Sequence, residues 1–374
     1  MGCSGDDVFT VSGPTHMMTK NSSIEIDWES EDHRRIILAC LVRGVYVMQG
    51  DGTNKRNPPL APAWWESFHF RLHKKMLSRD CECRSCQLLE ANRCGAIVFE
   101  YAPPEDAAHR HPSSAPRYVV AFRGTIVTKP WHVSAIRDIC LDGTIVLNQQ
   151  HECHTFHQAR EQFGDFLETI ADGGNGGSAT GTSGAVWLAG HSLGASIALD
   201  VGRDLASRKD YYLPTFLFNP PQMSAAPAIG MLPMAAVAKG VFASSYLLKH
   251  VLGETVMKPH KELMESLFKQ LSPWVPNLYV NPRDVLCRGF VDYFEQLEQT
   301  KEWSAGVAAS AATLSYRDMF YFLFGKQNDR PHLLPSAVVW KNQSSQGDPH
   351  GLGQWWQQQG PELVLSSKQY RWSS

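Results

Sequence analysis

The stretch VWLAGHSLGASIALD, residues 186–200, limits the possible folds of this chain more than any other feature. A short apolar run leads directly into GHSLG, in which Ser192 lies between Gly190 and Gly194, and a segment rich in small residues follows. This order predicts a buried strand, a sharp turn that carries the serine, and a helix packed closely on a sheet. Glycines at the flanking positions permit the strained dihedral angles and close backbone approach of such a turn.

Short apolar runs recur along the chain, at AIVFEY (96–101), RYVVAFRG (117–124), TIVLNQ (144–149), TFLFN (215–219) and NLYVN (277–281). Most are separated by segments long enough for a helix, which is typical of a mostly parallel sheet with helices on its faces. We therefore predict an α/β domain over residues 95–374. One of its helices is expected from about His154 to Ile170, and the glycine-rich stretch 172–184 has the composition of a surface loop.

The first part of the chain has a different pattern. Residues 1–23 are polar and are expected to form a loose tail. Within residues 24–94, HRRIILACLVRGVYVM and PAWWESFHFRLHKKML place apolar residues three and four positions apart. This periodicity predicts an N-terminal helical extension.

Composition excludes some partners. The formal net charge is −2 and charged residues make up 19% of the chain, so the chain lacks the excess of basic residues that is typical of nucleic-acid binding. The apolar segment 223–248 contains prolines, Gly240 and Lys239, which argues against a membrane span. No evident signal peptide precedes the domain, so a cytoplasmic location is expected, with peripheral membrane contact left open. Acylation at Gly2 or Cys3 and the oligomeric state also stay open.

The nine cysteines are an odd number, which fits reduced thiols better than a disulfide framework. Four of them cluster at Cys81, Cys83, Cys86 and Cys94. A zinc site would require two tight pairs, whereas this spacing leaves one distant partner. We therefore expect a reduced insertion without a metal, and metal binding by the cluster is the alternative.

Ser192 is the candidate nucleophile. An alcohol needs an exposed position and an adjacent base to attack at neutral pH, and the turn after a strand provides the exposure. The same turn aims the backbone N–H of Leu193 at a developing oxyanion near the positive end of the helix. The alternative is a structural serine in a tight turn. His191 is interpreted as a packing residue rather than the base.

The acid and the base should follow the nucleophile along the chain. Asp284 lies in NLYVNPRD, just beyond an expected strand, and is favoured over Asp292 and Asp318, which fall in helix-like stretches. A buried carboxylate there would orient the histidine and stabilise its charged form. His350 lies in the loop-like GDPHGLGQWW and is favoured as the base over His332, which enters an extended apolar segment.

A second oxyanion donor is expected in the loop after an earlier strand. The strand in VVAFRGT ends at Arg123 and Gly124, so Thr125 follows as a candidate that could offer its backbone N–H and its hydroxyl. A plain turn threonine is the alternative for Thr125.

Several motifs resemble the lipase class 3 family, and more closely a plant group of lipase-like α/β-hydrolases often labelled GDSL esterase/lipase. The shared stretches, which cover most of residues 24–370, are EDHRR, APAWWESFHFRL, RYVVAFRGT, VWLAGHSLGA, FLFNPP, LYVNPRD, HLLPSA and HG-x-x-QWW. The resemblance implies an α/β-hydrolase fold with Ser192, Asp284 and His350 as a triad, and Thr125 with Leu193 at the oxyanion hole. The GDSL label does not suit a serine in a GxSxG turn, and Gly353 stands where a second histidine is expected.

The apolar segment 223–252 is expected to form a helical lid-like insertion, in which Leu247 and Leu248 contact acyl chains. An ordinary buried helix pair is the alternative. The expected function is hydrolysis of lipid acyl esters by a serine enzyme that needs no cofactor. An acyltransferase or thioesterase on the same site and a non-catalytic lipase-like scaffold are the alternatives, because sequence does not separate acyl-transfer chemistries that share an acyl-enzyme.

Overall fold

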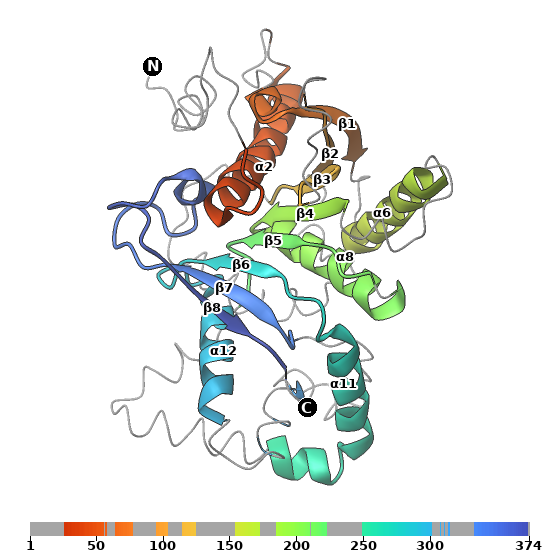
Figure 1. Ribbon diagram of the computed structural model, residues 1–374. Coiled ribbons are helices and arrows are strands. Elements are labelled where there is room, and N and C mark those ends of the chain that lie inside the picture. Colours follow the sequence, from red (N-terminus) through yellow and green to blue (C-terminus); the bar gives the residue numbers. More distant parts are fainter. Residues whose placement is uncertain are drawn as a thin grey trace.

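The computed structural model describes residues 26–55, 57, 64–77, 95–103, 114–124, 154–172, 185–209, 211–222, 249–300, 307, 310, 313–314 and 333–372. These residues form one eight-stranded sheet in which strands that are consecutive in the chain lie side by side (Figure 1). The strands are β1 (Phe70–Leu77), β2 (Gly95–Tyr101), β3 (Tyr118–Phe122), β4 (Val186–His191), β5 (Thr215–Phe218), β6 (Asn277–Val280), β7 (Ala337–Asn342) and β8 (Leu365–Tyr370).

The five central strands, β3 to β7, run parallel, whereas β1, β2 and β8 are antiparallel to their neighbours. Parallel central strands require crossover connections, and the intervening segments supply them with helices. The prediction of an α/β protein with a mostly parallel sheet is therefore confirmed, and the arrangement is compatible with an α/β-hydrolase fold.

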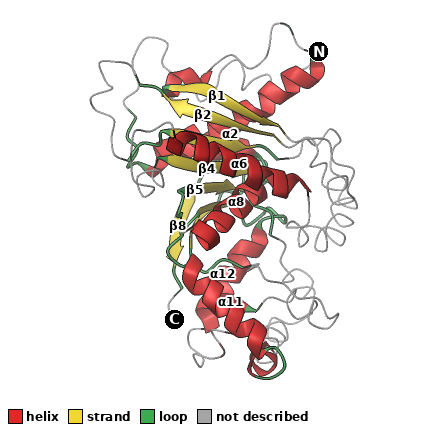
Figure 2. Cartoon of the chain, turned by 90° about the vertical axis from the view of Figure 1, so that its right-hand side faces the viewer, coloured by secondary structure: helices red, strands yellow, loops and turns green. Residues whose placement is uncertain are grey.

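Helices cover both faces of the sheet. One face carries α2 (Glu31–Asn54) with the short 3₁₀ helices η1 (Trp64–Phe68) and η4 (Leu352–Trp356), whose residues form one apolar cluster with the sheet. The other face carries four helices, which form a second apolar cluster with the sheet. Figure 2 shows these helices in front of the strands and below them. These helices are α6 (His154–Asp172), α8 (Leu193–Lys209), α11 (Lys258–Leu271) and α12 (Arg288–Thr300).

Burial on both faces explains why the strands read as continuous apolar runs. In β3, Val119 and Ala121 join the cluster with α2, whereas Val120 and Phe122 join the cluster with α6 and α8. Every residue of β3, β4 and β5 is buried. Alternation of apolar and polar residues is lost when neither face of a strand meets water.

The helical prediction for the first part of the chain is confirmed over α2 and wrong over residues 70–77. FRLHKKML has apolar residues at a helical spacing, yet it forms the edge strand β1, paired antiparallel with β2 from Phe70↔Tyr101 to Leu77↔Gly95. Pairing with the next strand outweighs local periodicity here. Exposed Lys74 and Lys75 on this strand suit an edge, since charged side chains discourage pairing with other chains.

Arg35 joins α2 to the segment after β7. Its guanidinium is fully buried, contacts the carboxylates of Asp32 and Glu31, and donates to the backbone carbonyls of Trp355 and Gln357. Figure 1 shows α2 beside this blue C-terminal segment. A buried cation is tolerated only when it is paired and hydrogen-bonded, as Arg35 is.

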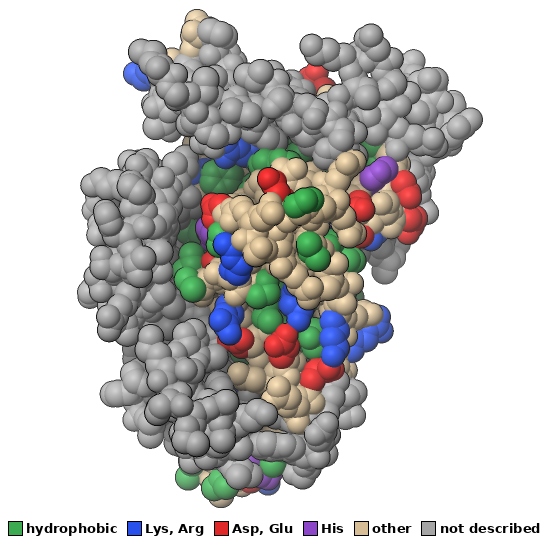
Figure 3. Space-filling model, turned by 90° about the vertical axis from the view of Figure 1, so that its left-hand side faces the viewer, with side chains coloured by type: hydrophobic (Ala, Val, Ile, Leu, Met, Phe, Trp, Pro, Cys, Tyr) green, Lys and Arg blue, Asp and Glu red, His purple; other side chains and the backbone are tan. Residues whose placement is uncertain are grey.

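The face shown in Figure 3 presents Lys and Arg side chains interspersed with Asp and Glu, and scattered apolar side chains between them. The described part of that face therefore carries charges of both signs. Among the described residues, no helix has the length and apolar character needed to cross a membrane.

Some predicted features lie outside the described residues. They are the tail 1–23, the expected strand at 144–149, the glycine-rich loop from residue 173 to 184, the four clustered cysteines, and most of the lid-like segment, including Leu247 and Leu248. Helix α6 confirms the helix expected from about His154 to Ile170. In the described part of the chain Cys40 and Cys287 are buried free thiols, and no three or more His, Cys, Asp or Glu side chains there are grouped so that they could hold a metal ion.

Candidate active site

Ser192 lies in a sharp turn between β4 and α8. Its backbone φ of 53° is in the left-handed region, which a serine adopts only when the surrounding structure imposes it. A Cβ on Gly190 would lie 2.5 Å from the Gly194 carbonyl oxygen, and one on Gly194 would lie 2.5 Å from the Phe122 carbonyl oxygen. Only glycine fits at either position, so the flanking glycines set the geometry of this strand–turn–helix.

Ser192, Asp284 and His350 meet at the carboxyl edge of the parallel strands. Ser192 follows β4, Asp284 follows β6, and His350 lies in the loop between β7 and η4. The Nε2 atom of His350 is 3.0 Å from Ser192 Oγ, and its Nδ1 atom is 2.7 Å from Asp284 Oδ2. Loops that follow the carboxyl ends of parallel strands gather at one edge of a sheet, which brings residues distant in sequence into one site.

The direction of these hydrogen bonds follows from the acceptors. An ionised carboxylate only accepts, so the Nδ1–H of a neutral His350 donates to Asp284 and leaves Nε2 free to accept the Ser192 hydroxyl proton. The Asp284 side chain is 3% exposed and that of His350 is 29% exposed. The site thus combines a buried carboxylate with a solvent-reachable imidazole and hydroxyl.

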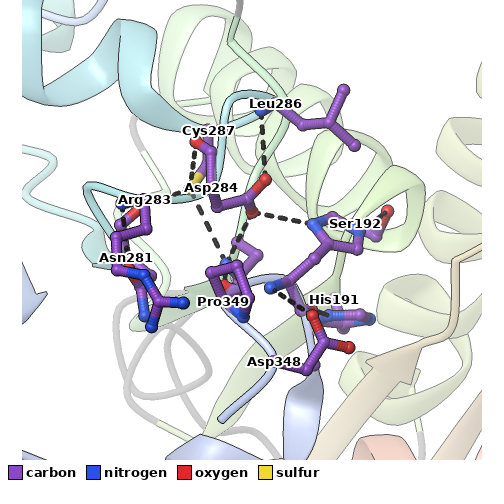
Figure 4. A network of polar contacts seen from close by, with 12 residues as sticks. His191, Ser192, Asn281, Arg283, Asp284, Leu286, Cys287, Asp348 and Pro349 are labelled. Atoms are coloured by element: carbon purple, nitrogen blue, oxygen red, sulfur yellow. Dashed lines mark hydrogen bonds and ion pairs between the residues drawn. The ribbon is translucent and has the colours of Figure 1, made fainter. Parts of the chain in front are cut away.

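Asp284 stays ionised in spite of its burial. Burial alone raises the pKa of its carboxyl, but hydrogen bonds from His350 and Asn219, and the positive charge that His350 carries when it is protonated, hold the pKa below its usual value. The backbone N–H of Leu286 also donates to Oδ1 at 3.0 Å, and Figure 4 shows this contact beside Asp284. The carboxylate is therefore ready to orient the imidazole at neutral pH.

Asn219 supports both the acid and the loop of the base. It is fully buried at the end of β5 with a φ of 46°, a conformation that asparagine tolerates better than most residues. Its Nδ2 donates to Asp284 Oδ2 at 2.8 Å and to the Pro349 carbonyl at 2.9 Å, while its Oδ1 accepts from Trp355 Nε1. One amide thus fixes the acid and the residue before His350.

Gln354 braces the same loop from η4. Its Nε2 donates to the carbonyl oxygens of Pro349 and Gly351, each at 2.9 Å. Its Oε1 accepts from the buried amides of Asn281 and Asn342. The loop around His350 is consequently held by polar groups that are themselves fixed, which is what a precisely placed base requires.

The oxyanion side of the site is described in part. Leu193 is buried and opens α8 directly after Ser192, as the sequence predicts. Gly124 lies against the serine, because a Cβ on it would be 2.9 Å from Ser192 Cβ. Thr125 lies outside the described residues, as do the alternatives Asp318 and His332, whereas Asp292 lies in α12 and pairs with Arg288 at 3.6 Å.

The chain is similar over most of its length to a plant protein of known class. An Arabidopsis thaliana protein named as a GDSL esterase/lipase is 34% identical over 368 residues, which cover 94% of this chain and 95% of that protein. No family model and no solved structure matches the chain. The fold and this relative define the class as that of the carboxylic ester hydrolases. The chain belongs to the plant esterase/lipase family of the Arabidopsis protein.

Sequence reasoning missed the supporting residues Asn219, Gln354 and Tyr46, whose hydroxyl oxygen lies 2.7 Å from the backbone N of Gly124 and 2.9 Å from His191 Nδ1. Asn219 lies in FLFNPP and Gln354 in HG-x-x-QWW, two stretches that carry the family resemblance. Their position in these motifs was a usable signal, although their roles depend on contacts between distant parts of the chain. Tyr46 lies in a helical run where nothing in the local pattern distinguishes it.

Proposed function

We propose that this chain is a serine hydrolase of lipid acyl esters, similar to class 3 lipases, with Ser192, Asp284 and His350 as its triad. The observation that carries the proposal is the position of His350, within hydrogen-bond distance of both Ser192 Oγ and Asp284 Oδ2. A nucleophile, a base and a group that orients the base, each in reach of the next, are the requirements of acyl transfer through a serine.

In the proposed reaction, His350 Nε2 takes the hydroxyl proton as Ser192 Oγ attacks the ester carbonyl carbon. Asp284 stabilises the imidazolium that forms. The backbone N–H of Leu193, with Thr125 as the second donor, would receive the oxyanion. The imidazolium then protonates the leaving alcohol, and a water activated by His350 releases the acid from the acyl-enzyme. The serine is the one in GHSLG, so the nucleophile belongs to a GxSxG turn rather than to a GDSL motif.

A lipid substrate is supported by the family to which the chain belongs, since the Arabidopsis relative is named as an esterase/lipase. The proposal therefore expects faster turnover of long acyl chains than of acetate. Because the chain-length dependence is measured on one enzyme, it separates a lipase from a short-chain esterase without a comparison protein.

The test is hydrolysis of p-nitrophenyl esters from acetate to palmitate by wild type, Ser192→Ala and Ser207→Ala. Loss of a triad nucleophile lowers kcat by roughly 10⁶-fold in well-studied serine enzymes, so Ser192→Ala should be inert within detection. Ser207→Ala, which removes a hydroxyl bonded to the Arg203 carbonyl further along α8, should retain wild-type kcat. A fluorophosphonate should label wild type but not Ser192→Ala.

Other results would redirect the proposal. Turnover that requires an added acceptor alcohol would indicate an acyltransferase, and activity confined to thioesters would indicate a thioesterase. If folded wild type neither hydrolyses any ester nor reacts with the fluorophosphonate, the triad assignment is wrong and a non-catalytic scaffold becomes the better account.

A further inference from the structure

A chain of hydrogen bonds links α2 to both sides of the site. The backbone N of Gly124 is 2.7 Å from the Tyr46 hydroxyl oxygen, which is 2.9 Å from His191 Nδ1. On the other side of its ring, His191 Nε2 is 2.9 Å from the carbonyl oxygen of His350. The Tyr46 and His191 rings meet edge to face with centroids 5.9 Å apart, and the rings of His191 and His350 are 5.2 Å apart.

The hydrogen positions in this chain are determined by its two ends. The His350 carbonyl can only accept, so His191 Nε2 carries the hydrogen. His191 is neutral, because burial is the largest of the effects that lower its pKa to about 3, and its Nδ1 is therefore an acceptor. The Tyr46 hydroxyl donates to that Nδ1, and its oxygen accepts from the Gly124 N–H. All three bonds thus point from Gly124 toward His350.

The backbone at Gly124 is closely surrounded by groups from the site and from α2. A Cβ there would lie 2.7 Å from the His191 carbonyl oxygen and 2.8 Å from the Tyr46 hydroxyl. The fully buried Arg123 donates from Nη1 to the Gly124 carbonyl at 2.9 Å and from Nε to Gln49 of α2. Both polar groups of the Gly124 backbone are therefore held by side chains anchored on or against α2.

We propose that Tyr46 and His191 are positioning residues of the ester-hydrolysis site: they hold the backbone at Gly124 and the backbone at His350 in fixed register on either side of Ser192. Gly124 directly precedes the expected oxyanion donor Thr125, and His350 is the expected base. The inference rests on the proposed function, because the two residues are expected to affect the rate of ester hydrolysis. Neither side chain transfers a proton or contacts the substrate.

The first test is Tyr46→Phe, which keeps the ring and removes the hydroxyl that joins Gly124 to His191. The expected result is a fall in kcat of about tenfold with KM within about twofold of wild type, because the lost bonds align reacting groups rather than bind substrate. Tyr293→Phe is the matched control. Its hydroxyl donates to the Leu334 carbonyl at 3.1 Å, so it loses a comparable bond elsewhere and should keep wild-type kcat.

The second test compares His191→Gln with His191→Phe. A glutamine amide places a donor near the former Nε2 and can still bond to the His350 carbonyl, whereas phenylalanine cannot. The glutamine variant should therefore retain the larger share of kcat. Equal kcat in the two variants, or equal kcat in Tyr46→Phe and Tyr293→Phe, would overturn the positioning role.

A third measurement does not depend on turnover. In protein labelled with ¹⁵N-histidine, His191 should stay in the neutral Nε2–H tautomer between about pH 5 and pH 8, the range in which an unperturbed histidine titrates. An Nδ1–H tautomer, or titration of His191 in that range, would overturn the hydrogen-bond chain itself. Failure of the proposed function would look different: wild type would be inert and unlabelled by fluorophosphonate while the His191 tautomer is still observed.

Discussion

At the scale of single residues, Asn219 makes a specific prediction. Asn219→Asp replaces the donor to Asp284 with a second carboxylate and leaves the Pro349 carbonyl without its Asn219 partner. Two like charges at hydrogen-bond distance cannot both stay ionised, so one proton is held to higher pH. We expect kcat/KM to fall by at least about tenfold and its acidic limb to move to higher pH.

The matching control for this prediction is Asn277→Asp at the opposite end of β6. The side-chain oxygen of Asn277 accepts from Trp340 Nε1 at 3.1 Å, and a carboxylate oxygen of aspartate can accept in the same way. A full pH–rate profile of both variants makes the comparison. An Asn219→Asp enzyme whose acidic limb coincides with that of wild type would show that Asn219 does not set the charge of Asp284.

At the scale of elements, the contact between α8 and β3 leads to a prediction about two glycines. A Cβ on Gly194 would lie 2.5 Å from the Phe122 carbonyl oxygen and 2.6 Å from that of Arg123, both of them backbone atoms that cannot rotate away. Gly194→Ala should therefore push α8 off the sheet and destabilise the fold by about 1–3 kcal/mol, with loss of ester turnover.

Gly164→Ala in α6 is the counterpart, because nothing lies within 4 Å of a Cβ built there. Alanine is the better helix former, so this variant should gain about 0.5–1 kcal/mol. Urea denaturation followed by circular dichroism measures both changes. If Gly194→Ala is as stable and active as Gly164→Ala, the close approach of α8 to β3 is not required.

The helices and strands also show which parts of the structure the sequence patterns could predict. Periodicity identified α2 and α6, and the GHSLG context identified the turn between β4 and α8, because these features depend on neighbours in the chain. Strand β1 was missed because its own pattern suits a helix, whereas its structure depends on pairing with β2, which local periodicity does not reveal. Ser192, Asp284 and His350 could be selected from motif order, whereas Tyr46 is recognisable only once α2 is placed against the sheet.

At the scale of the whole molecule, buried His191 makes stability depend on pH. Its pKa is lowered to about 3 in the folded state, with burial as the largest cause, while an unfolded histidine titrates near 6.5. Between these values the unfolded chain binds the extra proton, so stability is complete above about pH 6.5 and falls as pH decreases toward 3.

For one proton, the free energy of unfolding should change by up to about 1.4 kcal/mol per pH unit in that window. His191→Gln removes this contribution, so its urea midpoint should vary less steeply with pH than that of wild type. Parallel curves for the two proteins would show that His191 is not neutral in the folded state. Asp284 also makes the folded state less stable as pH falls, but at lower pH. The pKa of its carboxyl is lower in the folded state than in the unfolded chain, so its contribution to stability is lost as the pH falls through the folded-state pKa.

The hydrogen bonds that connect α2 with the segment around η4 have a consequence for synthesis on the ribosome. Arg35 and Tyr46 lie in the first helix that the structure describes. Arg35 donates to the Trp355 carbonyl, and Tyr46 reaches the His350 carbonyl through His191, so both contacts join an early part of the sequence to a late one. The turn at Ser192 is translated well before His350, the base in the proposed triad. Under the proposed function, a nascent chain therefore carries Ser192 without its base until His350 has been added and its loop can fold against α2.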